Sequence, residues 1–138
     1  NGLFYCCKSA IPLMKERQDG LIINISSWSG NHVSLLSGVS YTSSKHALNA
    51  MTETINMKYC NLGIRACALC PGEVSTAILD KRPKKLSKEQ KDKMLQPDDL
   101  GETIAFICQM PKHVCINELT ISPTWHRRYI ADLGIEEL

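Results

Sequence analysis

Apolar residues along the chain follow two spacings, one typical of helices and the other typical of buried strands. In three segments they recur three or four residues apart, which places them on one face of a helix. Between these segments lie short apolar runs with several β-branched residues, as in strands that are covered on both faces. The pattern predicts helices over about residues 3–18, 41–60 and 97–110, and strands over 21–25, 64–69 and 116–122.

The predicted helices and strands alternate along the chain. Alternation of this kind implies right-handed crossovers between parallel strands, with helices on both faces of the sheet. We therefore predict an α/β fold with a parallel, doubly wound, Rossmann-type sheet. Three strands make a small sheet for this fold, and the sequence has no initiator Met. We expect residues 1–138 to form a single partial domain that earlier strands would complete.

Length and charge narrow the possible functions. At about 150 residues per domain, 138 residues allow one domain at most. The net charge of +2 is too small to favour nucleic acid or an anionic membrane as a partner. Nor does any apolar run approach the roughly 20 residues that span a bilayer. We expect a globular protein with neither nucleic acid nor a membrane as its partner.

The seven cysteines form no repeated framework of the kind found in small disulfide-rich proteins. Cys67 and Cys70 make a CxxC, but it lies in a predicted strand, where residues three apart point to opposite faces. No second CxxC or paired His completes a metal site, so we predict none. The interpretation we favour is buried, reduced thiols rather than a functional pair. It implies a reducing compartment, most simply the cytoplasm.

Two segments lack a helical or strand pattern. Residues 26–40 contain several Ser and Gly and are predicted as a loop. Residues 77–96 are basic, with seven Lys or Arg between Lys81 and Lys93. A solvated surface segment would explain this composition. A mobile substrate lid that meets an anionic ligand would also explain it, whereas binding of a nucleic acid or another anion is a weaker alternative.

Tyr41 and Lys45 are four residues apart in a predicted helix, so they share one face near its beginning. An ammonium group beside a phenol stabilises the phenolate. Such a tyrosine can exchange a proton with an alcohol or a carbonyl compound. The YxxxK pattern alone is weak, because a surface pair on an amphipathic helix gives the same spacing.

The surroundings of this pair strengthen the prediction. Ser26 and Ser27 follow one predicted strand, and Pro71 and Gly72 follow the next. Both positions lie at the carboxyl edge of a parallel sheet, which is where ligands bind in open α/β folds. A serine hydroxyl fourteen residues before Tyr41 could donate a hydrogen bond to the same substrate oxygen.

With these residues the sequence resembles the short-chain dehydrogenase/reductase family over nearly its whole length. Ser27, Tyr41 and Lys45 match the family's catalytic Ser, Tyr and Lys, and Ser27 is preferred over Ser26 because it stands three residues before Gly30. The resemblance implies an oxidoreductase that transfers a hydride between NAD or NADP and a small alcohol or ketone. It also implies a homodimer or homotetramer.

The run from Pro71 to Thr76, PGEVST, matches the family's PGxVxT motif for the nicotinamide end of the cofactor. By the resemblance, Val74 offers its backbone to the carboxamide, Thr76 its hydroxyl, and Lys45 also binds the ribose. The family's glycine-rich phosphate loop does not occur in these 138 residues. A non-catalytic fragment or interaction module without cofactor binding is therefore the alternative. The implied cofactor-binding set is Tyr41, Lys45, Pro71, Gly72, Val74 and Thr76.

Overall fold

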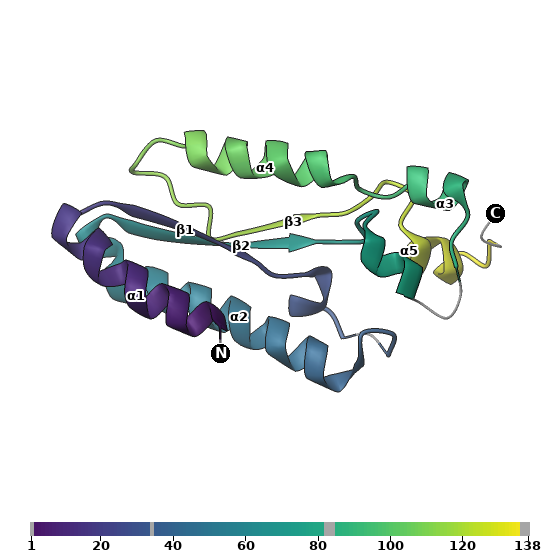
Figure 1. The fold of residues 1–138 in the computed structure, drawn as a ribbon, viewed down its shortest axis with the longest axis horizontal. Helices are drawn as coiled ribbons and strands as arrows, with labels where there is room; N and C mark the ends of the chain where they lie inside the picture. Colours follow the sequence, from purple (N-terminus) through teal and green to yellow (C-terminus); the bar gives the residue numbers. More distant parts are fainter. Residues whose placement is uncertain (1, 34, 82–84, 136–138) are drawn as a thin grey trace.

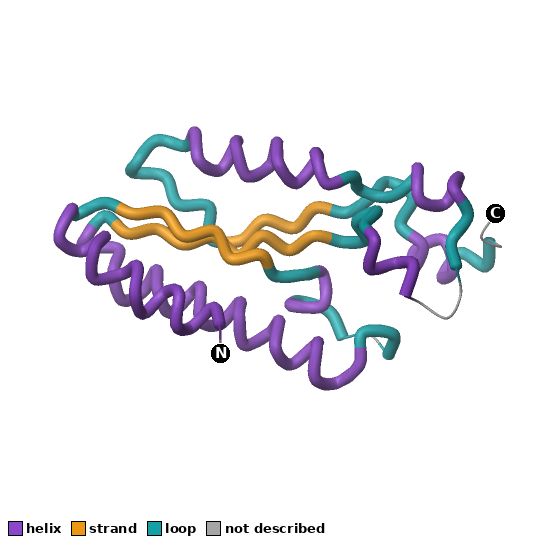
Figure 2. The backbone as a smooth tube through the Cα atoms, viewed as in Figure 1, coloured by secondary structure: helices purple, strands orange, loops and turns teal. Residues whose placement is uncertain are grey.

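A computed structural model describes residues 2–33, 35–81 and 85–135, and within them it confirms the parallel α/β fold. Three parallel strands lie side by side in the order β1-β2-β3, and β2 is in the middle. Figures 1 and 2 show the helices in two layers, with α1 and α2 on one face of the sheet and α4 on the other. The strands are β1 (Gly20–Ile25), β2 (Ile64–Pro71) and β3 (Glu118–Ile121), and the helices are α1 (Gly2–Arg17), α2 (Gly38–Tyr59), α3 (Lys88–Asp92), α4 (Pro97–Gln109) and α5 (Arg127–Asp132).

The core lies between β2 and the helices α1 and α2. Ile64 and Ala66 of β2 are 1% and 0% exposed, and they pack in one cluster with Cys7 and Ile11 of α1 and Ile55 of α2. Burial of this apolar surface is the main force that joins the helices to the sheet. A buried polar contact also crosses this layer, since Asn24 of β1 donates to the Thr52 hydroxyl of α2 at 2.8 Å.

The three strands pair in a parallel register, so their carboxyl ends lie at the same edge of the sheet. Ile22 pairs with Ala66, and Ala68 pairs with Glu118. Because the strands are parallel, the residues after β1, β2 and β3 emerge on the same side. In Figure 1 this edge faces α3 and α5.

The predicted loop over residues 26–40 was partly wrong. Trp28–Gly30 form a short 3-10 helix, and α2 begins at Gly38, three residues before Tyr41. Gly38 has a φ of +72°, which glycine adopts without a steric cost. The apolar spacing that predicted this helix begins only where α2 packs on the sheet, so its solvated first turn left no hydrophobic pattern.

Residues 77–96 contain two short helical segments that the apolar spacing did not predict. Ala77–Lys81 form a 3-10 helix, and α3 begins with a capping box between Ser87 and Gln90. Ser three residues before Gln is a recognised helix-start signal, which could have been used here. Both segments are too short to show a helical period of apolar residues.

Candidate active site

Ser27 lies just beyond the end of β1. It caps the Trp28–Gly30 helix, because its Oγ accepts a hydrogen bond from the Ser29 backbone N–H at 3.2 Å. The Ser27 carbonyl also accepts from Gly30 N–H at 2.8 Å. These contacts fix the start of the short helix, and the preceding Ser26 N–H, which donates to the Leu69 carbonyl of β2 at 2.7 Å, ties it to the carboxyl edge of the sheet. The hydroxyl proton of Ser27 is not used in the cap, since Oγ is the acceptor there.

Tyr41 and Lys45 lie on one face of α2, as their spacing predicts. The Lys45 Nζ is 5.6 Å from the centre of the Tyr41 ring. The same Nζ donates to the carbonyl of Ile25, the last residue of β1, at 2.9 Å. The ammonium group therefore lies between the tyrosine ring and the strand end that Ser27 follows. Tyr41 is 46% exposed, so a ligand can reach its ring and hydroxyl.

The PGEVST motif lies at the end of β2 and is held from two sides. The Gly72 N–H donates to the Ile121 carbonyl of β3 at 2.7 Å. Val74 forms a parallel β-bridge with Leu95, and the Ser75 N–H donates to the Leu95 carbonyl at 2.8 Å. Thr76 is exposed at the end of this run. All three motifs matched to the family thus lie at the ends of β1 and β2 or on the helix between these strands.

An aromatic cluster stands next to Ser27, and the sequence analysis missed it. The Trp28 ring stacks on His32 with 4.4 Å between ring centres and contacts His126 at 4.7 Å. The His126 ring in turn stacks on Tyr129 at 4.2 Å. No spacing rule could have joined these residues, because Trp28 and His126 are far apart in the sequence and meet only through the fold.

His126 is buried within this cluster, at 8% exposure. Burial lowers the pKa of the His126 imidazole, while the nearby Glu73 carboxylate acts in the opposite direction and Arg128 and His32 lower the pKa further. Burial in the cluster therefore favours the uncharged form of the His126 imidazole, which suits its packing against Trp28.

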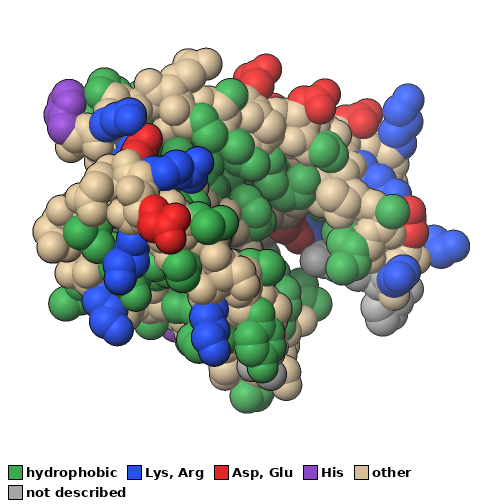
Figure 3. All heavy atoms as spheres, turned by 60° about the vertical axis from the view of Figure 1, so that its left-hand side comes forward, with side chains coloured by type: hydrophobic (Ala, Val, Ile, Leu, Met, Phe, Trp, Pro, Cys, Tyr) green, Lys and Arg blue, Asp and Glu red, His purple; other side chains and the backbone are tan. Residues whose placement is uncertain are grey.

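Residues 77–96 are attached to the body of the protein near both ends. Leu79 and Met94 are 3% and 6% exposed. Between them, Lys91 pairs with Asp80 at 2.6 Å, and Lys93 lies over the Trp125 ring at 4.8 Å from its centre. In Figure 3 basic and acidic side chains are interspersed over the face in view. Residues 82–84 of this basic segment lie outside the described part of the chain.

Cys67 and Cys70 are both 0% exposed and are free cysteines, so the CxxC pair is buried as predicted, whereas Cys6, Cys60, Cys108 and Cys115 are exposed. Burial raises the pKa of the Cys67 thiol to about 11, and it also raises the pKa of Cys70. Neither thiol is therefore an activated nucleophile. Within residues 2–33, 35–81 and 85–135, no group of three or more His, Cys, Asp or Glu is arranged to hold a metal ion.

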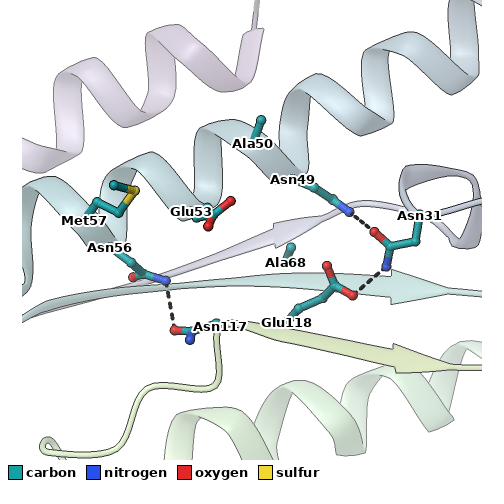
Figure 4. A pocket seen from close by; sticks show the side chains of 9 residues that line it. All are labelled: Asn31, Asn49, Ala50, Glu53, Asn56, Met57, Ala68, Asn117 and Glu118. Atoms are coloured by element: carbon teal, nitrogen blue, oxygen red, sulfur yellow. Dashed lines mark hydrogen bonds between the residues drawn. The ribbon is translucent and has the colours of Figure 1, made fainter.

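A polar pocket lies on the α2 side of the sheet, and no motif residue lines it (Figure 4). Asn49 of α2 donates to Asn31 at 2.8 Å, and Asn31 donates to Glu118 of β3 at 2.5 Å. Asn56 and Asn117 make a second contact across the pocket at 3.2 Å. Because Ser27, Tyr41 and Lys45 do not line this pocket, we assign it no part in the predicted chemistry.

Comparison with known proteins identifies the family. The sequence model of the short chain dehydrogenases matches residues 1–87. The chain belongs to the short-chain dehydrogenase family. Among the described residues, no helix is both long and apolar enough to cross a membrane.

Individual relatives agree with this assignment. A human dehydrogenase/reductase, SDR family member 11, is 35% identical over 132 residues, a match that covers 88% of this chain and 51% of the human protein. An uncharacterized oxidoreductase of Staphylococcus aureus is 33% identical over 122 residues, which cover 88% of this chain and 50% of that protein. The chain thus spans about half the length of the curated relatives it matches.

Solved structures show the same Rossmann-type architecture. One of them is an alcohol dehydrogenase from the archaeon Thermococcus sibiricus, complexed with 5-hydroxy-NADP. It is 25% identical in sequence and superposes with a TM-score of 0.74 over 90% of this chain and 50% of the dehydrogenase. The chain therefore forms part of the Rossmann-type α/β fold of this dehydrogenase family.

Proposed function

We propose that this chain supplies the catalytic half of an oxidoreductase that transfers a hydride between NAD or NADP and an alcohol or ketone. The observation that carries the proposal is the position of the Lys45 Nζ. It lies 5.6 Å from the Tyr41 ring centre and 2.9 Å from the carbonyl that ends β1, two residues before Ser27. A tyrosine, an ammonium group and a serine at one strand end are the groups that proton transfer to or from a carbonyl oxygen requires.

The residues at this edge also fit a nicotinamide cofactor. The backbone of Pro71, Gly72 and Val74 lies at the end of β2, and the hydroxyl of Thr76 is on an exposed residue. Lys45 has further ammonium protons to give to a ribose hydroxyl, because its hydrogen bond to the Ile25 carbonyl uses one of three. A bound cofactor would supply or accept the hydride.

The side chains then have separate roles in the reaction. Tyr41 gives its phenolic proton to the carbonyl oxygen in reduction and takes it back in oxidation. Lys45 stabilises the phenolate that remains. Ser27 donates its hydroxyl to the same oxygen, which it can do because its Oγ accepts, rather than donates, in the 3-10 cap. The developing negative charge on the oxygen is thus met by two hydrogen-bond donors.

The test is made on the complete enzyme, meaning the natural gene product that contains residues 1–138. We expect NADH or NADPH to be oxidised when members of a panel of ketones and aldehydes are added, as followed by loss of reduced-nicotinamide absorbance. The proposal would be contradicted if the protein binds the cofactor but no ketone or aldehyde of the panel raises the rate at which NADH or NADPH is oxidised.

The alternative is a non-catalytic fragment or interaction module. It is favoured for the isolated chain because these residues contain no glycine-rich phosphate loop. We expect residues 1–138 expressed alone to bind neither NAD nor NADP with micromolar affinity in a calorimetric titration. Binding as tight as that of the complete enzyme would show that the glycine-rich half is dispensable.

The proposal assigns residues 77–96 the role of a substrate lid. They follow the cofactor motif and are anchored at Leu79 and Met94, and residues 85–93 between these anchors are exposed or half-buried, so opening this part would cost little. We expect hydrogen exchange of amides 85–93 in the complete enzyme to slow when cofactor and substrate are both bound. Equal exchange with and without the two ligands would leave only the solvated-surface interpretation.

We propose further that the enzyme acts on a small-molecule alcohol or carbonyl compound and forms a homodimer or homotetramer. Large apolar side chains on α1 and α2 support the assembly, since Phe4, Tyr5 and Met57 are 56%, 61% and 77% exposed. Seven free cysteines, three of them buried and four exposed, fit a cytoplasmic location, where thiols stay reduced.

A further inference from the structure

A partly buried ion pair joins the cofactor motif to the segment that follows β3. Arg127 Nε donates to Glu73 Oε2 at 2.7 Å, and Arg127 Nη2 donates to Glu73 Oε1. The two side chains are only 19% and 24% exposed. By contrast, the pair between Lys112 and Asp19 leaves the lysine side chain 78% exposed. A two-point, sheltered guanidinium–carboxylate contact fixes orientation far better than an exposed single contact.

Glu73 occupies the position inside PGEVST where its side chain can control the backbone on both sides. It follows Gly72, whose N–H bonds to Ile121, and precedes Val74, which forms the bridge with Leu95. The Glu73 carbonyl also accepts from the Leu95 N–H at 3.1 Å. These contacts hold the backbone from Gly72 to Val74, and Arg127 holds the Glu73 side chain.

Arg127 itself is fixed by its neighbours. It is the first residue of α5, and His126 just before it is buried against the Trp28 and Tyr129 rings. Trp28 directly follows Ser27. One short segment, residues 126–129, therefore contacts the cofactor motif through Arg127 and the loop of the proposed catalytic serine through His126.

We propose that Arg127 is a positioning residue that holds Glu73, and thereby the backbone of residues 72–76, in the conformation that receives the nicotinamide end of the cofactor. This inference rests on the proposed function for its ligand, but the restraint on the motif exists without one. Arg127 does not act on the reacting atoms. Its loss raises the cost of ordering the motif when the cofactor binds, and so weakens binding more than it slows the chemical step.

The test compares Arg127→Met, Arg127→Lys and Glu73→Gln with Lys112→Met, a control that removes a cation from the exposed pair with Asp19. In the complete enzyme we expect Arg127→Met to weaken cofactor binding about tenfold, with kcat at saturating cofactor changed by less than about twofold. Glu73→Gln should weaken it similarly, and the double variant should lose little more than either single one. Arg127→Lys should retain part of the affinity, and Lys112→Met all of it.

A second measurement needs no cofactor. Hydrogen exchange of amides 72–76 in the unliganded protein should be faster in Arg127→Met than in the wild type, while amides within β2 stay unchanged. If Arg127→Met does not fold, Glu73→Gln and Arg127→Lys are measured in its place. Unchanged exchange and unchanged affinity in folded variants overturn the inference. If exchange is faster in Arg127→Met but the wild type binds no cofactor, Arg127 does hold residues 72–76. The proposed function is then overturned instead of this inference.

Discussion

Tyr41→Phe is expected to lower kcat of the complete enzyme by about a hundredfold or more, because the substitution removes the proton donor and leaves the ring in place. The Tyr41 ring packs near Lys45 Nζ, and phenylalanine keeps that ring. Cofactor affinity and the free energy of unfolding should therefore change little. The measurement is the steady-state rate at saturating cofactor and substrate, together with a cofactor titration of the same variant.

A matched control is Tyr59→Phe, which removes the same hydroxyl near the other end of α2. Its rate should equal that of the wild type, because Tyr59 packs against the core rather than at the carboxyl edge. Retention of more than about a tenth of the wild-type rate by Tyr41→Phe would rule out proton transfer by Tyr41.

Gly63→Ala is expected to cause a large loss of stability through two separate effects. Gly63 ends the turn between α2 and β2 with a φ of +68°, a conformation that costs an alanine about 1–2 kcal/mol. A Cβ at this position would also press into the backbone carbonyl of Gln18, in the turn between α1 and β1. Backbone cannot move aside as a side chain can, so overpacking adds a further 1–3 kcal/mol or so.

The control is Gly38→Ala, because Gly38 has a φ of +72° but an added Cβ there would meet no atom of another part of the described chain within 4 Å. This variant should lose only the conformational part, about 1–2 kcal/mol. Urea unfolding of both variants separates the two effects. Equal losses would show that the turns at Gln18 and Gly63 do not constrain each other.

The sequence was sufficient to predict the layers of the fold because apolar residues at helical spacing alternate along the chain with short, continuous apolar runs. The helix that holds Tyr41 and Lys45 is an example, since residues such as Ile55 recur along the face that packs on β2. Its first turn could not be predicted from that pattern, because Gly38 and Val39 are exposed. Short elements such as α3 depend on single capping contacts, which a periodicity argument does not detect.

Ser27 and the PGEVST motif follow strand ends in the sequence, so the parallel topology brings them to one edge, and the four-residue spacing of Tyr41 and Lys45 places that pair on one face of the helix between these strands. The contacts that hold these motif residues in place could not be predicted from the sequence. Glu73 and Arg127 are joined only by the path of the chain after β3, and so are Trp28 and His126. Pairs of this kind leave no spacing in the sequence, and only the folded structure shows them.

The most direct test of the central claim is a titration of the complete enzyme with NADH and with NADPH, using the wild type, Lys45→Met and the control Lys58→Met. Lys45 lies at the carboxyl edge of the sheet, whereas Lys58 lies in the last turn of α2. We predict micromolar binding of one cofactor by the wild type and Lys58→Met, and at least about tenfold weaker binding by Lys45→Met. Absence of binding by the wild type, or equal affinity in all three proteins, would contradict a nicotinamide site at this edge.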